Sequence, residues 1–253
     1  MISLSHRLSA VAAMVSPGDR VVDIGTDHAY IPMYLVEQGV KKHAVAGDVN
    51  KGPLTIAAKH IEANSLSDCI STCLSNGLDK LDIESYDSIV IAGMGGLLIK
   101  SILANDLSKS KVAKELVLQP QSEIRELRSF LYENGFVIVN EDAVYEDGKY
   151  YFIMKALLRE RYLEQLDRCT APNGQPAGQL YELNSDMLEF GPVLLDKKDP
   201  VLKAYIEKQM EIMSGVRSGL IKSQPNPGIV ARMKEVETTI SKLKSVLEEY
   251  YAV

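Results

Sequence analysis

The fold of this chain can be predicted from one stretch, Val21-Val22-Asp23-Ile24-Gly25-Thr26-Asp27-His28-Ala29-Tyr30-Ile31-Pro32. It begins with an apolar run interrupted only by Asp23 and continues through small and polar residues. It ends at Pro32, which suits the first turn of a helix. This order predicts a buried strand, a tight turn and then a helix. Ligands of open α/β sheets bind at the carboxyl ends of the strands beside such turns. We therefore expect the chain to be arranged around a ligand site here.

The glycine pattern of this turn distinguishes two classes of nucleotide-binding fold. NAD-binding proteins carry G-x-G-x-x-G, but Gly25 is followed by Asp27 and Tyr30 where the other two glycines would stand. An acidic residue just before a short glycine turn, as Asp23 is here, resembles the first motif of Rossmann-like S-adenosylmethionine methyltransferases. Asp27 and Ala29 stand where glycines are usual in that motif. The pattern therefore favours a specialised subfamily of these methyltransferases over a dehydrogenase.

The composition is that of a globular protein. The 253 residues are 46% hydrophobic and 25% charged, which leaves room for one large domain or for a domain with an appendage. No apolar run is long enough for a membrane span. Residues 1–16 mix charge and serine with apolar positions, so they predict an amphipathic helix rather than a signal peptide. Cys69, Cys73 and Cys169 lack metal-ligand spacing, which predicts reduced thiols, no metal site and a cytoplasmic location.

The net charge of -6 is unevenly distributed along the chain. Residues 196–253 carry 10 Lys and Arg against 8 Asp and Glu, whereas residues 1–195 carry 18 against 26. A polyanionic partner would therefore need a local basic patch rather than a basic domain.

Two further predicted strands end in polar residues that suit a nucleoside. The strand at 42–48 ends in Asp48, about 20 residues past the first turn, where Rossmann folds hold a ribose hydroxyl. The alternative is that Asp48 is an ordinary strand-end residue. The strand at 70–74 is followed by Asn76 and Gly77. Asn76 can hydrogen-bond an adenine edge, although Asn-Gly is also a common turn pair.

The remaining strands complete a mixed sheet. The strand at 88–92 runs into Gly93-Met94-Gly95-Gly96, where three glycines indicate a close approach of the backbone to ligand or substrate. A fifth strand is predicted at 116–120. Strands at 136–145 and 150–158 are joined by Glu146-Asp147-Gly148 and predict a terminal hairpin. Parallel strands followed by such a hairpin match the methyltransferase form of the fold better than the dehydrogenase form.

The C-terminal part predicts two long helices. Residues 170–178 are rich in Pro, Gly, Asn and Gln and predict a linker. Beyond it, apolar residues alternate spacings of three and four, with Gln209 at one position of the seam. These seam residues are Leu202, Ile206, Met213, Val216 and Leu220, then Ile229, Met233, Val236, Ile240, Leu243, Leu247 and Tyr250. The break at 224–228 makes the pair an antiparallel coiled-coil hairpin.

The sequence therefore predicts an α/β protein with two domains. Residues 1–158 are expected to form a Rossmann-like class I methyltransferase sheet, mostly parallel with a terminal antiparallel hairpin, that binds the cofactor. Residues 159–253 are expected to form an α-helical domain with the coiled-coil hairpin. The second domain offers no chemical site and is expected to act as an arm that contacts a partner.

Several motifs together resemble one family, the bacterial tRNA (adenine(22)-N1)-methyltransferases. They are Ser5-His6-Arg7-Leu8, Asp23 to Pro32, Gly47-Asp48-Val49-Asn50-Lys51-Gly52-Pro53, Asn76-Gly77-Leu78, Ile91-Ala92-Gly93-Met94-Gly95-Gly96, Leu118-Gln119-Pro120 and Phe190-Gly191-Pro192. The resemblance covers nearly the whole chain. The specific feature is the combination of Gly-Thr-Asp-His with Ala-Gly-Met-Gly-Gly. The resemblance implies a protein that uses S-adenosyl-L-methionine to methylate N1 of an adenosine in tRNA. We also expect a monomer with no membrane and no metal partner.

The resemblance also implies site residues at the matching positions. The expected cofactor residues are Asp23, Gly25, Thr26, Asp27, Asp48, Val49, Asn50, Asn76, Gly77, Ala92, Gly93 and Met94. The expected substrate residues are Arg7, Tyr30, Pro32, Gly95, Gly96 and Gln119. The expected catalytic residues are Asp27, His28 and Tyr30. At positions 48 and 76, where this chain has Asp and Asn, we would expect Glu and Asp equally often in the family pattern. Neither difference should impair cofactor binding.

The expected reaction requires few catalytic groups from the protein. Adenine N1 has a free in-plane lone pair, so rate should come from alignment, which can supply roughly 7–11 kcal/mol. Positive charge passes to the purine, and Asp27 is the candidate to stabilise it, unless it only caps the next helix. His28 and Tyr30 are expected to orient or stack on the base, unless His28 is merely a turn residue. The base must also leave its stack.

Two other functions fit the sequence less well. One is a methyltransferase that acts on another RNA or on a small molecule, which would work without the C-terminal arm. The other is a non-catalytic scaffold that binds the cofactor and transfers no methyl group.

Overall fold

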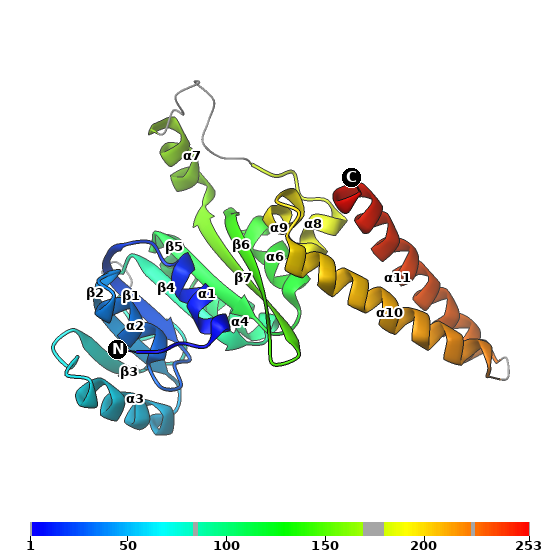
Figure 1. Cartoon of the computed structure of the whole chain (residues 1–253). Coiled ribbons are helices and arrows are strands. Elements are labelled where there is room, and N and C mark those ends of the chain that lie inside the picture. The colour runs from blue at the N-terminus through cyan, green and yellow to red at the C-terminus, as the bar shows by residue number, and fades with distance from the viewer. Residues whose placement is uncertain (1, 83–85, 169–179, 224–225, 253) are drawn as a thin grey trace. The chain divides into compact units, whose positions relative to one another are not determined.

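The computed structural model describes residues 2–82, 86–168, 180–223 and 226–252, and the chain divides into two compact units, Met1–Leu183 and Asn184–Val253 (Figure 1). The first unit contains a seven-stranded sheet with the order β3-β2-β1-β4-β5-β7-β6. Its strands are β1 Gly18–Ile24, β2 Lys41–Asp48, β3 Ile70–Leu74, β4 Ser88–Met94, β5 Glu115–Pro120, β6 Phe136–Glu146 and β7 Lys149–Leu158. The first five strands are parallel, and β7 is antiparallel to both of its neighbours. The predicted mixed sheet with a terminal hairpin is confirmed.

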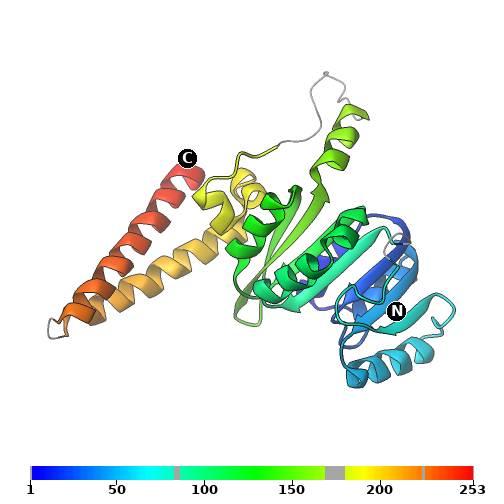
Figure 2. The same ribbon diagram turned by 180° about the vertical axis from the view of Figure 1, so that it is seen from behind.

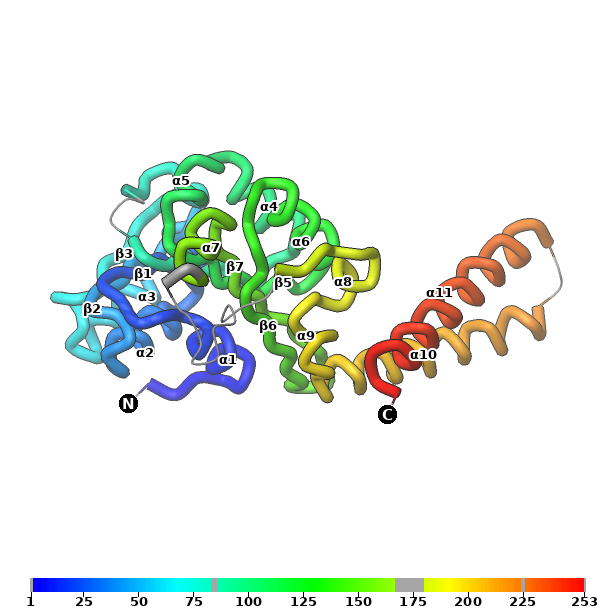
Figure 3. The backbone as a smooth tube through the Cα atoms, turned by 90° about the horizontal axis from the view of Figure 1, so that it is seen from above, coloured from blue at the N-terminus to red at the C-terminus, as the bar shows by residue number. Residues whose placement is uncertain are grey.

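Helices cover both faces of this sheet. They are α1 His6–Met14, α2 Tyr30–Glu37, α3 Lys51–Ala63, α4 Gly96–Asn105, α5 Leu107–Val112, α6 Ile124–Glu133 and α7 Arg159–Arg168. Figure 2 shows α4 and α6 on the face opposite to α1 and α2, and Figure 3 shows the same two layers from above. α7 belongs to the first unit, whereas the domain boundary predicted between residues 158 and 159 would place it in the helical domain. That boundary of the catalytic domain stays a prediction.

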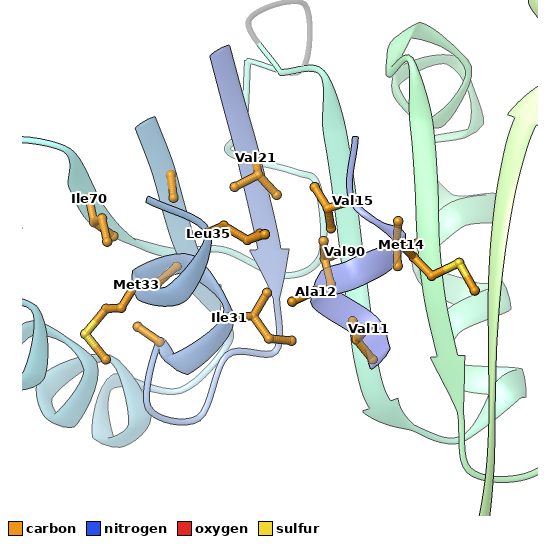
Figure 4. Close-up of a cluster of buried hydrophobic side chains, with 14 of the residues drawn as sticks. Val11, Ala12, Met14, Val15, Val21, Ile31, Met33, Leu35, Ile70 and Val90 are labelled. Atoms are coloured by element: carbon orange, nitrogen blue, oxygen red, sulfur yellow. The ribbon is translucent and has the colours of Figure 1, made fainter. Parts of the chain in front are cut away.

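The core beneath α1 and α2 holds the first strand in place. Val11 and Val15 in and just after α1 are buried, and so are Ile31 and Leu35 in α2 (Figure 4). These side chains and that of Val21 in β1 form one hydrophobic cluster on this face of the sheet. Burying one such side chain stabilises the fold by about 1.5–3 kcal/mol. The apolar pattern of residues 1–16 thus forms the expected amphipathic helix, which begins at Ser5 with a side chain that accepts a hydrogen bond from the Leu8 amide.

The second unit consists of four helices, α8 Ser185–Phe190, α9 Pro192–Asp196, α10 Pro200–Ile221 and α11 Pro227–Tyr251. Gly191 joins α8 to α9 with a φ of 99°, a backbone conformation that favours glycine. α10 is capped by Asp199, whose carboxylate accepts hydrogen bonds from the Val201 and Leu202 amides. α10 and α11 pack side by side (Figure 1).

The seam between α10 and α11 follows the predicted spacing. Leu202, Ile206, Val236 and Leu243 are buried, and the other expected seam residues, Gln209 included, are half-buried. The helical region is therefore confirmed, while supercoiling of the pair stays a prediction.

Candidate active site

The polar motifs of the sequence meet at the carboxyl edge of the sheet. β2, β1 and β4 are neighbours and run parallel, so their carboxyl ends lie at one edge. Asp48 ends β2, Asp23 lies one residue before the end of β1, and Gly93 lies one residue before the end of β4. β3, which is followed by Asn76, is the other neighbour of β2. The fold thus brings the expected cofactor residues together from four segments.

The turn after β1 is held by the neighbouring strand. The amides of Gly25 and Thr26 both donate to the Gly47 carbonyl, at 2.8 and 3.0 Å. Gly25 has a φ of 76°, and a Cβ at this position would collide with the methyl group of Met94. The Thr26 hydroxyl accepts a hydrogen bond from the Ala29 amide at 3.2 Å, just before α2 begins. Glycine is therefore required at position 25 for both its backbone and its lack of a side chain.

Asp23 is a buried acid without a cationic partner. The residue is only 6% exposed, and it makes no ion pair within the described residues. Burial raises its pKa to about 6, the Thr26 hydroxyl lowers it, and the nearby Asp48 raises it further. A ligand with a positively charged amine at this position would compensate the carboxylate.

Asp48 and its neighbours present both polar and apolar groups. One oxygen of the Asp48 carboxylate accepts a hydrogen bond from the Asn50 amide at 2.6 Å, and the second oxygen makes none within the described residues. Val49 is 60% exposed, and Asn76 is exposed beyond β3. Asp48 thus offers a carboxylate oxygen to hydroxyl groups, and Val49 offers an exposed apolar side chain beside it. This combination suits a nucleoside.

Three rings cluster at the start of α2. The rings of His28 and Tyr30 lie 5.4 Å apart, and His60 of α3 lies 5.3 Å from His28 and 5.8 Å from Tyr30. Tyr30 is 40% exposed. The buried Nδ1 atom of His28 has no hydrogen-bond partner in the described part of the chain, while its Nε2 atom lies 3.1 Å from a carboxylate oxygen of Asp27. The alternative that Asp27 caps α2 is wrong, because Ala29 occupies the cap position and α2 has no side-chain cap.

Sequence reasoning missed His60. It lies in the last turn of α3, outside every motif, so only the packing of α3 beside the β1–α2 turn reveals it. Its Nδ1 atom lies 3.4 Å from the His28 carbonyl oxygen.

Arg7, Gly93 and Gln119 form a second cluster at the same edge. The Gln119 side-chain oxygen accepts hydrogen bonds from Arg7 Nη1 at 2.8 Å and from the Gly93 amide at 3.2 Å. The Arg7 guanidinium also lies over the ring of Tyr151, 5.3 Å from its centroid. Gln119 itself is fully buried, so in this structure it holds Arg7 and Gly93 rather than facing solvent.

Two other expected substrate residues have packing roles. Gly96 is buried, and a Cβ there would lie 2.5 Å from the backbone oxygens of Ser122 and Glu123. Pro32 is buried in the first turn of α2. Direct contact of either residue with a substrate stays a prediction. Gly95 is half-buried, with ordinary helix-cap backbone angles.

The described residues hold neither a metal-binding cluster nor a helix suited to a membrane. Among them, no group of His, Cys, Asp and Glu side chains is placed to hold a metal ion. In the same part of the chain, no helix combines the length and apolar character needed to cross a bilayer.

Comparison with known proteins supports one family. Residues 4–154 match the family model described as a methyltransferase domain. The chain is 30% identical to the tRNA (adenine(22)-N(1))-methyltransferase of Bacillus subtilis (strain 168) over 247 residues, which cover 98% of each protein. Its fold is similar to the crystal structure of the B. subtilis m1A22 tRNA methyltransferase TrmK, with a TM-score of 0.78, 27% identity and coverage of 98% of this chain and 100% of that one. It is equally similar to M. capricolum TrmK in complex with the cofactor product S-adenosyl-homocysteine, with a TM-score of 0.78, 28% identity and coverage of 98% and 99%.

Proposed function

This chain belongs to the tRNA (adenine(22)-N1)-methyltransferase family, and we propose that the carboxyl edge of its sheet is where the methyl group is transferred. The protein transfers a methyl group from S-adenosylmethionine to N1 of an adenosine in tRNA. One observation carries the assignment of the site: the buried Asp23 carboxylate, which lacks a cationic partner in the described chain, lies near Asp48 at the ends of adjacent strands. The amine of the cofactor would compensate Asp23, and its ribose hydroxyls would bind Asp48.

The protein's own groups account for binding and alignment. S-adenosylmethionine, when bound, supplies a methyl group on a positively charged sulfur. Gly93 has a φ of 79° and is exposed, so its backbone can lie close to the reacting atoms. Tyr30 offers its exposed ring for stacking on the adenine. The Asp27 carboxylate stabilises the positive charge that develops on the purine. Adenine N1 is unprotonated at neutral pH, so the site needs no general base.

A labelling experiment tests this function. The protein is incubated with radiolabelled S-adenosylmethionine and unmodified tRNA, and the labelled base is mapped. We expect label at N1 of adenosine 22, and none when that adenosine is replaced by guanosine. Label on the guanosine-22 tRNA, or no transfer at all, would contradict the proposal.

His60 is proposed to position the two rings that face the adenine. His60→Ala removes two ring contacts, each worth about 0.5–1.5 kcal/mol, so we expect kcat to fall roughly tenfold. His60→Phe, which keeps a ring, should restore most of the activity. The affinity for S-adenosylmethionine should stay the same in both variants. Turnover is measured with saturating cofactor, and His43→Ala, at an exposed histidine of β2, is the matched control. Equal kcat in the His60→Ala and His43→Ala variants would show that the ring cluster has no role in turnover.

The helical hairpin is proposed to bind the tRNA body. Arg217, Lys222 and Lys234 are exposed and make no ion pair with any described residue. By contrast, Lys203 and Lys208 pair with Glu207 and Glu211. Cations without acidic partners are free to bind phosphates, and such contacts make affinity fall with salt.

Replacing Arg217, Lys222 and Lys234 together by alanine is expected to weaken tRNA binding and to reduce the salt dependence of affinity. Removal of each cation that binds a phosphate should lower the slope by about 1, and the affinity for S-adenosylmethionine should not change. Binding is measured at several salt concentrations. A matched triple variant replaces Lys203, Lys208 and Lys244, each of which is paired with a glutamate. If the slope falls equally in both triple variants, binding is nonspecific and the proposed surface is wrong.

We also propose that the enzyme acts as a monomer in the cytoplasm, where its tRNA substrate is found. Analytical ultracentrifugation of the enzyme with and without tRNA measures this directly, and a dimer in both samples would contradict it.

A further inference from the structure

A polar cavity lies at the opposite edge of the sheet from the proposed methyl-transfer site. Its volume is about 370 Å³. Lys41, Ser88 and Glu115 line it, and they are the first residues of β2, β4 and β5. Since these strands are parallel, the cavity lies at their amino ends. Ser16, Asp87, Lys114 and Lys155 line it as well.

The two carboxylates of the cavity have their hydrogen-bonding needs met. Glu115 accepts hydrogen bonds from the Ser16 amide at 2.8 Å and the Ser88 hydroxyl at 2.7 Å, and it pairs with Lys155 at 2.7 Å. Asp87 accepts from the Asp19 and Arg20 amides at 2.6 and 3.1 Å and pairs with Lys114. Burial opposes ionisation of Asp87, but these partners hold its pKa down at about 2.

One cation of the cavity, Lys41, is left with unused hydrogen-bond donors. Lys41 is fully buried, and its Nζ atom makes no hydrogen bond with any residue that the structure describes. It forms an ion pair with Asp87, whose nearer carboxylate oxygen is 3.7 Å away. An ammonium carries three N–H donors. Burial lowers the pKa of Lys41, and Asp87 and Glu115 only partly oppose this. A buried charge without a hydrogen-bonded partner is costly.

The net charge of the cavity favours the same kind of ligand as the unused N–H donors of Lys41. Three lysines and two carboxylates line the cavity, which leaves one positive charge in excess when all are ionised. A neutral ligand would not compensate this charge, whereas a small anion would supply both the charge and the missing acceptors.

We propose that this cavity binds a free small oxyanion, a phosphate or a carboxylate, with Lys41 as the buried cation that receives it. Lys114, which is exposed, can supply a further donor, whereas Lys155 already pairs with Glu115 and donates to the Ser16 hydroxyl at 2.5 Å. The site is separate from the proposed cofactor site, which lies at the carboxyl ends of the same strands.

The full-length protein is titrated with inorganic phosphate and, separately, with acetate at constant ionic strength. Amide signals of Ser16 and Asp19 are followed by NMR. We expect saturable shifts with at least one of the two anions. Lys41→Met, which keeps the apolar stem, should weaken that binding at least tenfold. Lys42→Met is the matched control, because the neighbouring Lys42 is exposed and paired with Asp19 at 2.6 Å.

A second variant keeps the test decisive if Lys41→Met does not fold. Asn140 also lines the cavity, and Asn140→Asp adds a carboxylate of nearly the same size beside the lysines. It should weaken phosphate binding at least tenfold while binding of S-adenosyl-homocysteine stays unchanged, which checks the fold. Shifts that do not saturate, or that are the same in wild type and both cavity variants, would mean that only water fills the cavity. Displacement of bound phosphate by tRNA would show that the anion is an RNA phosphate, and would overturn the proposal of a free ligand.

Discussion

Replacing Asp48 by alanine is expected to weaken the binding of S-adenosylmethionine by about 100-fold or more. The ribose presents two hydroxyl groups, and each charge-assisted hydrogen bond to the carboxylate is worth about 1.5–3 kcal/mol. The residue lies at the end of β2, where one oxygen already accepts the Asn50 amide. Calorimetric titration with S-adenosylmethionine measures the change.

Two further variants separate charge from structure. Asp48→Glu keeps the carboxylate and should lose much less affinity, whereas Asp48→Asn should behave more like the alanine variant. Asp19→Ala is the control, because Asp19 is an exposed acid at the start of β1. Wild-type affinity in the Asp48→Ala protein would remove Asp48 from the cofactor site.

Replacing Asp23 by asparagine is expected to stabilise the free protein at neutral pH and yet to weaken cofactor binding. The pKa of Asp23 rises from 3.8 to about 6 on folding, chiefly through burial. A raised folded-state pKa gives stability that is fully present below the unfolded-state value and is lost as pH rises through 6. Two pKa units correspond to about 3 kcal/mol. At pH 7.5, Asp23→Asn should therefore raise the free energy of unfolding by up to that amount relative to its effect at pH 3.5.

The effect of Asp23→Asn on cofactor binding should be opposite to its effect on the stability of the free protein. If the cofactor amine compensates Asp23, binding by the wild type requires the ionised carboxylate, so affinity should fall about tenfold per pH unit below 6. The asparagine variant should bind more weakly at pH 7.5 and lose this pH dependence. Unfolding is measured by urea titration without cofactor, and affinity by calorimetry between pH 5 and 7.5. A variant that is less stable at pH 7.5 and binds normally would show that Asp23 has only a structural role.

The sheet and the turn after β1 were predictable because their signals are local. A buried strand, Gly25 and the acid before it lie within a few residues, and the turn geometry requires them at those positions. The terminal hairpin and the seam of the long helices follow in the same way from short periodic patterns.

The contacts around the expected substrate residues were less predictable because they join residues that are distant in sequence. His60 reaches the ring cluster from another helix. Gln119 lies in the matched motif, but only the structure shows that it is buried and bonded to Arg7, 112 residues away. The predicted capping alternative for Asp27 failed because Ala29, with a φ of 58°, takes the cap position. Motifs thus identify residues, whereas packing decides which of them face a ligand.

The uneven burial along the helical hairpin has a consequence for its motions. The start of α10 and the end of α11 contribute the buried Leu202, Ile206, Leu243 and Val246, whereas seam residues nearer the connection, such as Met213 and Met233, are only half-buried. Local opening costs less where fewer apolar contacts must be broken. Amide hydrogen exchange should therefore be slow at the base of the hairpin and progressively faster towards the connected ends of α10 and α11. Such a gradient would let the outer turns adjust to the curvature of an RNA while the base stays folded.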